Sequence, residues 1–386
     1  MPAYNSTDLL NQIVQEQASD AFLTGGITEE NYKKILQSHT CKLYTPNYFI
    51  RIALGAVTII AVLFTAILFG LLFASSGSAA FVVLCFFLGI VCYGALELLV
   101  KNKNYYNAGV DNILMVSVIV FIISAFFVYD STTDYILISG VVITLSLYLC
   151  LRFADAFMAI ISYLSFFIFV FFLYLKLGAI AKSTAPFLMI IISASIYLMM
   201  KSLAKKEGSM IYNFCTKCVM LLTLLTFYAS TNYFVVKELS NQMFGLRITI
   251  HGGIPMGWLF WVCTFAIPIL YIFYGVKRKD LLFIRTGLGL IAITIFTVRY
   301  YHNIFSAEIS MLIAGSIIVA LSYFLIQHLK TSKHGFTSRN LHPGNKNLLN
   351  AEALIIAQTF GDSPKTASNN IFGGGTGGGG GATGNF

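Results

Sequence analysis

The stretch that decides the fold is residues 49–100, which read FIRIALGAVTIIAVLFTAILFGLLFA, then SSGS, then AAFVVLCFFLGIVCYGALELLV. Two long apolar runs, 49–74 and 79–100, flank these four small residues. A helix that crosses the about 30 Å apolar core of a bilayer needs about 20 consecutive apolar residues. Because the link is so short, the two helices must be antiparallel neighbours. The stretch therefore predicts a hairpin of membrane-spanning helices.

Apolar runs of this kind continue along the chain. We expect eight further spans, at residues 109–129, 134–151, 156–175, 184–200, 217–236, 257–276, 281–299 and 308–328. The composition agrees, since 57% of the 386 residues are hydrophobic and 11% are charged, whereas about 25% are charged in a soluble domain. A water-soluble fold of this length has no core large enough for so much apolar surface. The sequence predicts an all-α fold, a polytopic transmembrane helix bundle of about ten spans over residues 49–328.

The basic residues between the spans predict the orientation of the chain. With residues 1–48 in the cytoplasm, the inner connections hold most of them: Lys101, Lys103, Arg152, Lys201, Lys205, Lys206, Lys277, Arg278 and Lys279. The outer connections hold Lys176, Lys182, Lys237 and Arg247, with Arg299 at a span end. This asymmetry follows the positive-inside rule, and an even number of spans places both termini in the cytoplasm. The net charge of +9 thus reports orientation, and we exclude nucleic acid as a partner.

The two ends of the chain differ from the apolar middle. Residues 1–48 predict a cytoplasmic leader of two short helices, the first from about Thr7 to Phe22 and the second beginning at Thr28, a good N-cap residue. Such a hairpin is too small to fold well alone, so we expect it to pack on the membrane domain or on a partner. Residues 329–386 predict a cytoplasmic tail, basic and then glycine-rich, which is largely disordered because it cannot bury enough apolar surface.

Three ionisable residues of the predicted spans form a candidate polar pocket. Glu97, Asp111 and Arg285 all lie near the inner ends of their spans, and an ionisable residue in a membrane segment is a functional hypothesis because its burial is costly. One interpretation is a cytoplasm-facing pocket in which Glu97 or Asp111 meets Arg285. The other is local pairing or snorkelling, since Glu97 and Lys101 have the spacing of a helical ion pair.

A second candidate lies on the outer side. Arg299, His302 and Glu308 cluster between the ninth and tenth spans, and His251 lies beside two glycines in the longest outer loop. These four residues form a candidate outer-face site for a ligand. The alternative is that His251 is a solvated loop residue and that the nearby tyrosines belong to an interfacial aromatic belt.

The sequence does not favour an enzyme, a metal site or a cofactor. The six histidines include none paired at ligand spacing, and Cys215 and Cys218 form a CxxC without a second Cys or His pair. We interpret the seven cysteines as small buried apolar residues. The span interiors carry hydroxyl groups but no carboxylate near the midplane, which lowers the odds of a proton-driven pump. Pro268 is expected to kink the eighth span.

The leader carries a pattern that other proteins share. Gly26-Ile27-Thr28-Glu29-Glu30, followed by Tyr32 and by Ile35-Leu36, comes after an amphipathic helix. It resembles the opening of uncharacterised bacterial predicted-membrane-protein families, in which a short cytoplasmic helical leader precedes a polytopic membrane domain. It is also similar to short helical interaction modules at the ends of other bacterial proteins. The resemblance implies a multi-pass protein of the bacterial inner membrane and assigns no functional residues.

Two functions fit these observations. The first is a transporter for a small solute, which the span count, the kink at Pro268 and the polar groups near both interfaces favour. The alternative is a membrane scaffold or sensor that binds protein partners through its leader and tail. A transporter needs a water-accessible path lined by polar side chains, whereas a scaffold needs only a filled bundle in the lipid bilayer.

Overall fold

The computed structural model describes residues 2–23, 25–129, 135–244, 252–278 and 280–301, together with single positions between 312 and 327. The leader forms two helices, α1 (Ser6–Leu23) and α2 (Glu29–Ser38). The apolar runs form the following helices: α3 (Tyr48–Leu72), α4 (Gly77–Lys103), α5 (Val110–Tyr129), α6 (Tyr135–Phe153), α7 (Ala156–Leu175), α8 (Ala179–Leu203), the 3₁₀ helix η1 (Glu207–Tyr212), α9 (Asn213–Thr231), α10 (Tyr233–Phe244), α11 (Gly257–Arg278) and α12 (Leu281–Tyr301). The described part of the chain is all-α, as expected.

Nine helical segments of the described residues are long and apolar enough to cross a membrane. They are α3 to α9, α11 and α12, and they define a polytopic integral membrane protein. The tenth predicted span, 308–328, lies largely outside the described residues, and its described positions are helical. The predicted cytoplasmic tail, 329–386, lies outside them entirely.

The spans are arranged as successive antiparallel hairpins. The closest packed pairs are α4 with α5, α6 with α7, α8 with α9, and α11 with α12. In the last pair, glycines let the backbones approach. A Cβ atom on Gly275 would lie 2.7 Å from the Ile284 side chain, and one on Gly287 would lie 2.7 Å from the Ile272 side chain. Small residues at such contacts are a common means of helix association in membranes.

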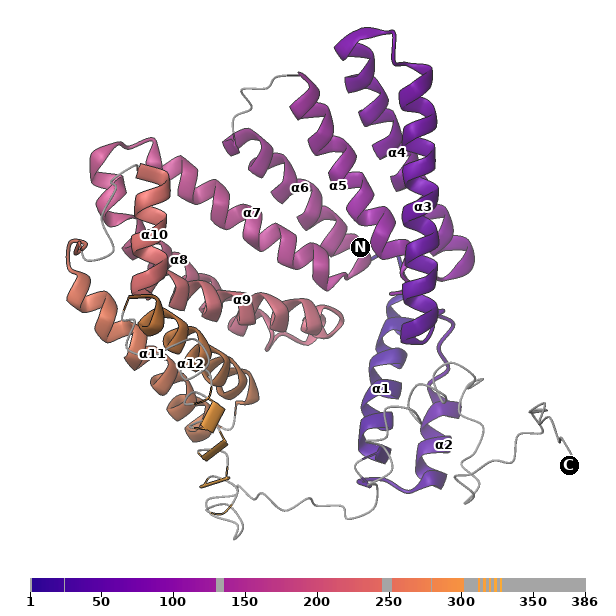
Figure 1. Cartoon of the computed structure of the whole chain (residues 1–386). Helices are drawn as coiled ribbons and strands as arrows, with labels where there is room; N and C mark the ends of the chain where they lie inside the picture. The colour runs from indigo at the N-terminus through magenta and orange to yellow at the C-terminus, as the bar shows by residue number, and fades with distance from the viewer. Residues whose placement is uncertain are drawn as a thin grey trace, which may run out of the picture.

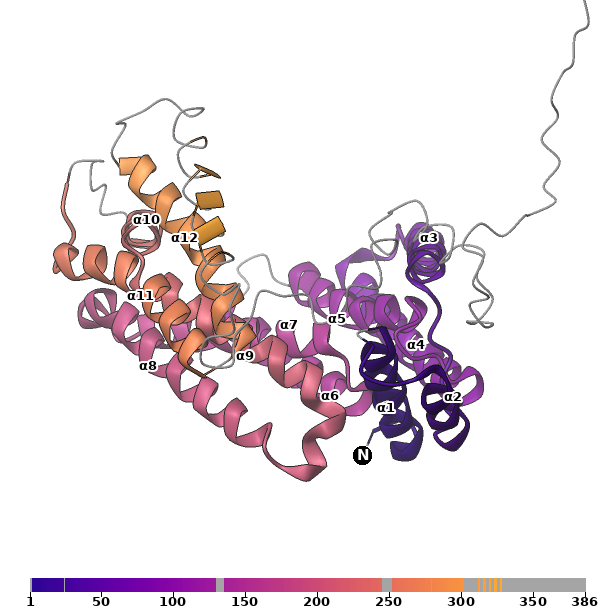
Figure 2. The same ribbon diagram turned by 90° about the horizontal axis from the view of Figure 1, so that it is seen from below.

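The connections define two ends of the membrane domain. We call the end that carries the α4–α5, α6–α7 and α8–α9 turns and the leader the leader end, and the opposite end the far end. Figure 1 shows the helices converging toward the leader end and spreading toward the far end. Figure 2 shows α8 to α12 on one side and α1 to α6 on the other, with α7 between them.

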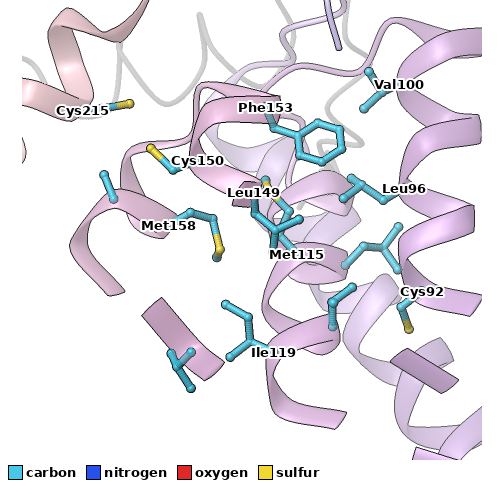
Figure 3. Packing of buried hydrophobic residues seen from close by; sticks show 14 of the residues in the cluster. Cys92, Leu96, Val100, Met115, Ile119, Leu149, Cys150, Phe153, Met158 and Cys215 are labelled. Atoms are coloured by element: carbon cyan, nitrogen blue, oxygen red, sulfur yellow. The ribbon is translucent and has the colours of Figure 1, made fainter. Parts of the chain in front are cut away.

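The largest hydrophobic core lies among α4, α5, α6 and α7. Leu96, Met115, Leu149, Phe153 and Met158 are its most completely buried side chains, and Figure 3 shows them pointing toward one another from their helices. Tyr4 and Leu9 of the leader and Cys215 of α9 belong to the same cluster. The core therefore extends to the leader end and includes the leader itself.

The leader docks on its own membrane domain. The Ala3 amide donates to the Arg152 carbonyl oxygen over 2.7 Å, and the buried Tyr4 ring lies edge-on to the rings of Tyr106 and Phe153. Tyr44 forms a parallel β-bridge with Tyr105, and α1 contacts η1. The Thr28 side chain caps α2 by accepting from the Asn31 amide, as predicted. The leader was expected to pack either on the membrane domain or on a partner, and the structure shows it packed on the membrane domain.

The seventh predicted span, 217–236, is wrong at both ends. Its helix, α9, begins at Asn213 and ends at Thr231, and a separate helix, α10, begins at Tyr233. The apolar character of the run continues through the break, so hydropathy alone does not reveal it. The remaining described spans differ from the predictions by a few residues at their ends, which is the usual range for helix boundaries.

Candidate functional site

The interruption between α9 and α10 is centred on one residue, Asn232. Its backbone leaves the helical conformation, with φ −76° and ψ 127°. Its amide still donates to the Tyr228 carbonyl oxygen over 2.8 Å, and its side-chain Oδ1 accepts from the Val235 amide over 3.2 Å. Asn232 therefore ends α9 and caps α10 at the same time, as an asparagine is well suited to do.

The Asn232 side chain also joins two other helices. Its Nδ2 donates to the Tyr228 hydroxyl over 3.0 Å and to Thr297 Oγ1 of α12 over 3.1 Å. The hydroxyls of Tyr228 and Thr294 are 2.8 Å apart, and Thr294 Oγ1 lies 3.1 Å from the Thr264 carbonyl oxygen of α11. Asn232, Thr264 and Thr297 are fully buried. We call Tyr228, Asn232, Thr264, Thr294 and Thr297 the break network.

The break network satisfies the backbone as well as the side chains. The Tyr233 amide, which the interruption deprives of a helical partner, donates to Thr264 Oγ1 over 3.0 Å. A free amide in an apolar interior is costly, so an interruption inside a membrane bundle needs such partners. The neighbouring helices α11 and α12 supply the hydroxyls that make the interruption stable.

A cavity of about 110 Å³ lies next to the interruption, between α7, α8, α9 and α10. Ser230 and Ser240 line it from the two sides of the break, and Pro186, inside α8, lines it from the opposite wall. Proline removes a backbone hydrogen bond from a helix. A cavity of this volume has room for several water molecules, and two irregular helices border it.

A buried lysine lies on the other side of α10. Lys237 is 2% exposed, and its Nζ lies 4.8 Å from the centre of the Tyr301 ring and 5.6 Å from that of Tyr233. Tyr233 in turn stacks on Trp261 with ring centres 4.8 Å apart. Aromatic faces attract cations, so the rings hold the ammonium group at the far end of α11 and α12.

Glu97, one residue of the predicted polar pocket, pairs with Arg152 of α6. The guanidinium Nε lies 2.9 Å from Oε1 of Glu97, and Nη2 lies 3.2 Å from Oε2. The Tyr93 hydroxyl donates to the same carboxylate over 2.8 Å and lies 2.7 Å from the Tyr148 hydroxyl. Neither Lys101 nor Arg285, the two partners expected from the sequence, takes this place.

Asp111 is buried at the first turn of α5, where its Oδ1 accepts from the Ala108 amide over 2.9 Å. A second buried carboxylate, Asp155, caps α7 by accepting from the Met158 amide over 2.8 Å. Its Oδ2 accepts from Asn112 Nδ2 over 2.9 Å. Burial raises the pKa of the Asp155 carboxyl above its ordinary value, although the Met158 amide opposes the shift. Asp155 therefore caps α7, whereas Asp111 holds the loop that precedes α5.

Arg285, the third residue of the predicted pocket, lies on a different part of the bundle. It lies exposed on α12, a helix that packs on α11 and α9, whereas Glu97 lies on α4, a helix that packs on α5. The hairpin arrangement thus separates the two residues. None of the ion pairs found among the described residues includes Arg285.

Of the four residues of the predicted outer-face site, the structure describes one, Arg299. Arg299 lies half-buried in the last turn of α12, whereas His251, His302 and Glu308 lie outside the described residues. Within the described residues, no three His, Cys, Asp or Glu side chains are arranged to hold a metal ion.

Sequence reasoning missed the break network and Asp155. The signal for Asp155 was present, because an acidic residue directly precedes an apolar run and such a residue is a standard helix start. For the break network the signal was weaker. Asn232 is an amide near the end of a long apolar run and Lys237 follows it closely.

Comparisons of this chain with protein-family models, with curated proteins and with solved structures find no match.

Proposed function

We propose that this integral membrane protein is a transporter for a small solute, and that the interruption at Asn232 lies on the solute path. The observation that carries the proposal is the buried interruption between α9 and α10, where Thr264 of α11 accepts from the Tyr233 amide and Thr297 of α12 accepts from the Asn232 side chain. Irregular backbone at membrane depth is tolerated where it is buried in protein or lines a cavity. Transporters use discontinuous helices to form their solute sites.

The surroundings of the interruption support this function. The cavity beside it is bordered by Ser230 and Ser240 and by Pro186 of α8. Helix interruptions and prolines are places where a helix bends, so the two walls of the cavity have hinges. We expect the cavity to open to one side of the membrane and then to the other by movement of α8 and α10.

We further propose that the leader end faces the cytoplasm of a bacterial cell, with the protein in the inner membrane. Helices that run toward the leader end finish with basic residues: Lys101 and Lys103 in α4, Arg152 in α6, Lys201 in α8, and Lys277 and Arg278 in α11. Positively charged connections remain on the cytoplasmic side. An epitope tag at residue 1 is then expected to be accessible to its antibody in inverted vesicles and protected from it in right-side-out vesicles.

The alternative function, a scaffold or sensor, retains one supporting observation. Helix α2 buries none of its residues, so its surface is open to a protein partner. Helix α1 and the residues before it, in contrast, are bound to the membrane domain through Ala3 and Tyr4. A partner-binding role therefore concerns α2 and the tail, 329–386, more than the whole leader.

Two-sided accessibility tests the transport proposal. Ser230→Cys, in a variant whose seven native cysteines are replaced by serine or alanine, is treated with a membrane-impermeant thiol reagent in right-side-out and in inverted vesicles. A solute path that opens alternately predicts labelling from both sides. Ile269→Cys, on the exposed face of α11, is the lipid-facing control and is expected to remain unlabelled. Absence of labelling at residue 230 from both sides contradicts transport through the interruption.

A further inference from the structure

A second, larger opening lies between the α6–α7 and α8–α9 hairpins. It has a volume of about 440 Å³, within the range of small-molecule sites, and it is distinct from the cavity at the interruption. Its walls run from Ile143 to Leu151 on α6, from Ile196 to Leu203 on α8 and from Cys215 to Val219 on α9, with Tyr212 of η1. We call this opening the leader-end cleft, because these segments lie in the half of the bundle that carries the turns.

The length of the leader-end cleft matches one leaflet of a bilayer. Nine residues of α6, from Ile143 to Leu151, cover about 12 Å at the helical rise of about 1.5 Å per residue. Half of the apolar core of a membrane is about 15 Å thick. An acyl chain that enters from the leader-end surface therefore fits along the cleft.

The walls of the leader-end cleft offer apolar surface to an occupant. Leu147, Leu151 and Met199 are about half exposed, although they line the cleft. Most of its hydroxyl groups already have partners: Tyr212 donates to the Leu151 carbonyl oxygen over 2.7 Å, and Ser209 Oγ lies 2.8 Å from the Leu203 carbonyl oxygen. A polar solute would find few free partners there, whereas a hydrocarbon chain needs none.

Positive charge is concentrated in the segment that joins α8 to α9, which also supplies Ser209 and Tyr212 to the wall of the leader-end cleft. The stretch from residue 201 to residue 217, which forms the α8–η1–α9 turn, contains four lysines and a single carboxylate, Glu207. Lys205, Lys206 and Lys217 are exposed, while Lys201 lies over the rings of Tyr197 and Tyr274. Basic pockets between membrane helices on the cytoplasmic side are sites for acidic lipid headgroups.

We propose that the leader-end cleft binds one anionic phospholipid, with an acyl chain between the two hairpins and the phosphate headgroup beside Lys205, Lys206 and Lys217. The apolar walls account for the chain and the lysines for the charge. The site goes beyond the proposed transport function, because it uses different residues and lies at the opposite end of α9 from Asn232.

Native mass spectrometry of the full-length protein tests this site with phosphatidylglycerol and phosphatidylcholine of equal chain length, added in equal amounts. The wild-type protein is expected to retain phosphatidylglycerol in excess. Lys205→Gln/Lys206→Gln is expected to reduce that excess on the order of tenfold, because each lysine near a membrane surface contributes severalfold to binding of acidic lipid. Lys101→Gln/Lys103→Gln, a basic pair at the end of α4, is the matched control and is expected to keep the excess.

A second variant tests whether the acyl chain of the lipid occupies the leader-end cleft. Ser162→Phe places a ring in the leader-end cleft and is expected to remove most of the retained lipid of both kinds. Met199→Trp, at an exposed wall position, replaces it if melting curves show that Ser162→Phe fails to fold. Equal retention of the two lipids by the wild type would overturn the proposal, as would equal losses in the two lysine pairs or unchanged retention in a folded cleft variant. Labelling at Ser230→Cys is independent of these outcomes.

Discussion

The α4–α7 core and the contact of α9 with α11 and α12 differ in whether they include charged side chains. The α4–α7 core buries neutral hydroxyls such as that of Ser146, and its charged groups lie toward the leader end, where the partly exposed Glu97 pairs with Arg152 and Asp155 caps α7. In the break network the polar side chains are neutral amide and hydroxyl groups inside the bundle. The carboxyl group of Asp155 satisfies a free amide at the start of α7, whereas neutral groups avoid the high cost of charge at depth. We therefore assign the charged groups at the leader end to the stability of the fold and the break network to the proposed transport function.

The largest expected effect concerns the α4–α7 core. Asp155→Ala removes the cap of α7 and the hydrogen bond that Asn112 donates to this carboxylate, which leaves Asn112 with its longer bond to Asn107. Loss of a cap costs about 0.5–2 kcal/mol, and loss of a hydrogen bond to a charged group costs about 1.5–3 kcal/mol. We expect the free energy of unfolding to fall by about 2–4 kcal/mol, measured by thermal unfolding of the purified protein in detergent.

Asp155→Asn is the matched control, because asparagine also caps helices well. It is expected to recover most of the stability that alanine loses. Equal destabilisation by alanine and asparagine would show that capping is not the role of Asp155.

The next effect distinguishes the observed ion pair from the expected one. Glu97→Gln removes the negative partner of Arg152, and both side chains are about a third exposed, so we expect a loss of about 1 kcal/mol. Lys101→Gln and Arg285→Gln are expected to leave the melting temperature unchanged. A loss in Arg285→Gln equal to that in Glu97→Gln would contradict the placement of these residues on separate hairpins.

A comparable effect on stability is expected at the break network. Asn232→Ala removes the hydrogen bonds from Nδ2 to Tyr228 and Thr297 and the cap of α10 at the Val235 amide. Side-chain hydrogen bonds between membrane helices contribute about 0.6 kcal/mol each on average, and loss of a cap costs about 0.5–2 kcal/mol. We expect a modest loss of stability and a large change in the accessibility of the cavity. Thr297→Val, which removes one partner of Asn232, is expected to act in the same direction and less strongly. A large loss of stability with unchanged accessibility of the cavity would show that the break network serves the fold and not the access to the cavity.

The smallest effect is a dependence on pH. Because burial raises the pKa of Asp155 in the folded protein, folding favours its neutral form. Its contribution to stability is therefore complete below the ordinary pKa of about 4 and is lost as the pH rises toward the raised value. The melting temperature of the wild type is expected to fall relative to that of Asp155→Asn over this window. A difference that grows in favour of the wild type with rising pH would contradict the burial of the carboxyl.

Hydropathy and local residue preferences predict much of the fold and little of the candidate site. The apolar runs locate the described spans, and Thr28 locates the start of α2, because both signals are local. The pairing of Glu97 with Arg152 depends on which hairpins lie side by side, which spacing along one helix does not reveal. The interruption at Asn232 depends on hydroxyls of two helices that follow later in the chain. For that reason hydropathy predicts a single helix over the apolar run 217–236.

We propose that the neutral break network, and not the charged leader end, controls access to the interior. The rate of labelling at Ser230→Cys from each side of the membrane, measured alone and together with Asn232→Ala or Glu97→Gln, tests this role. We expect labelling from both sides, a clear change with Asn232→Ala and no change with Glu97→Gln. Labelling that ignores Asn232→Ala, or that responds equally to both substitutions, would contradict it.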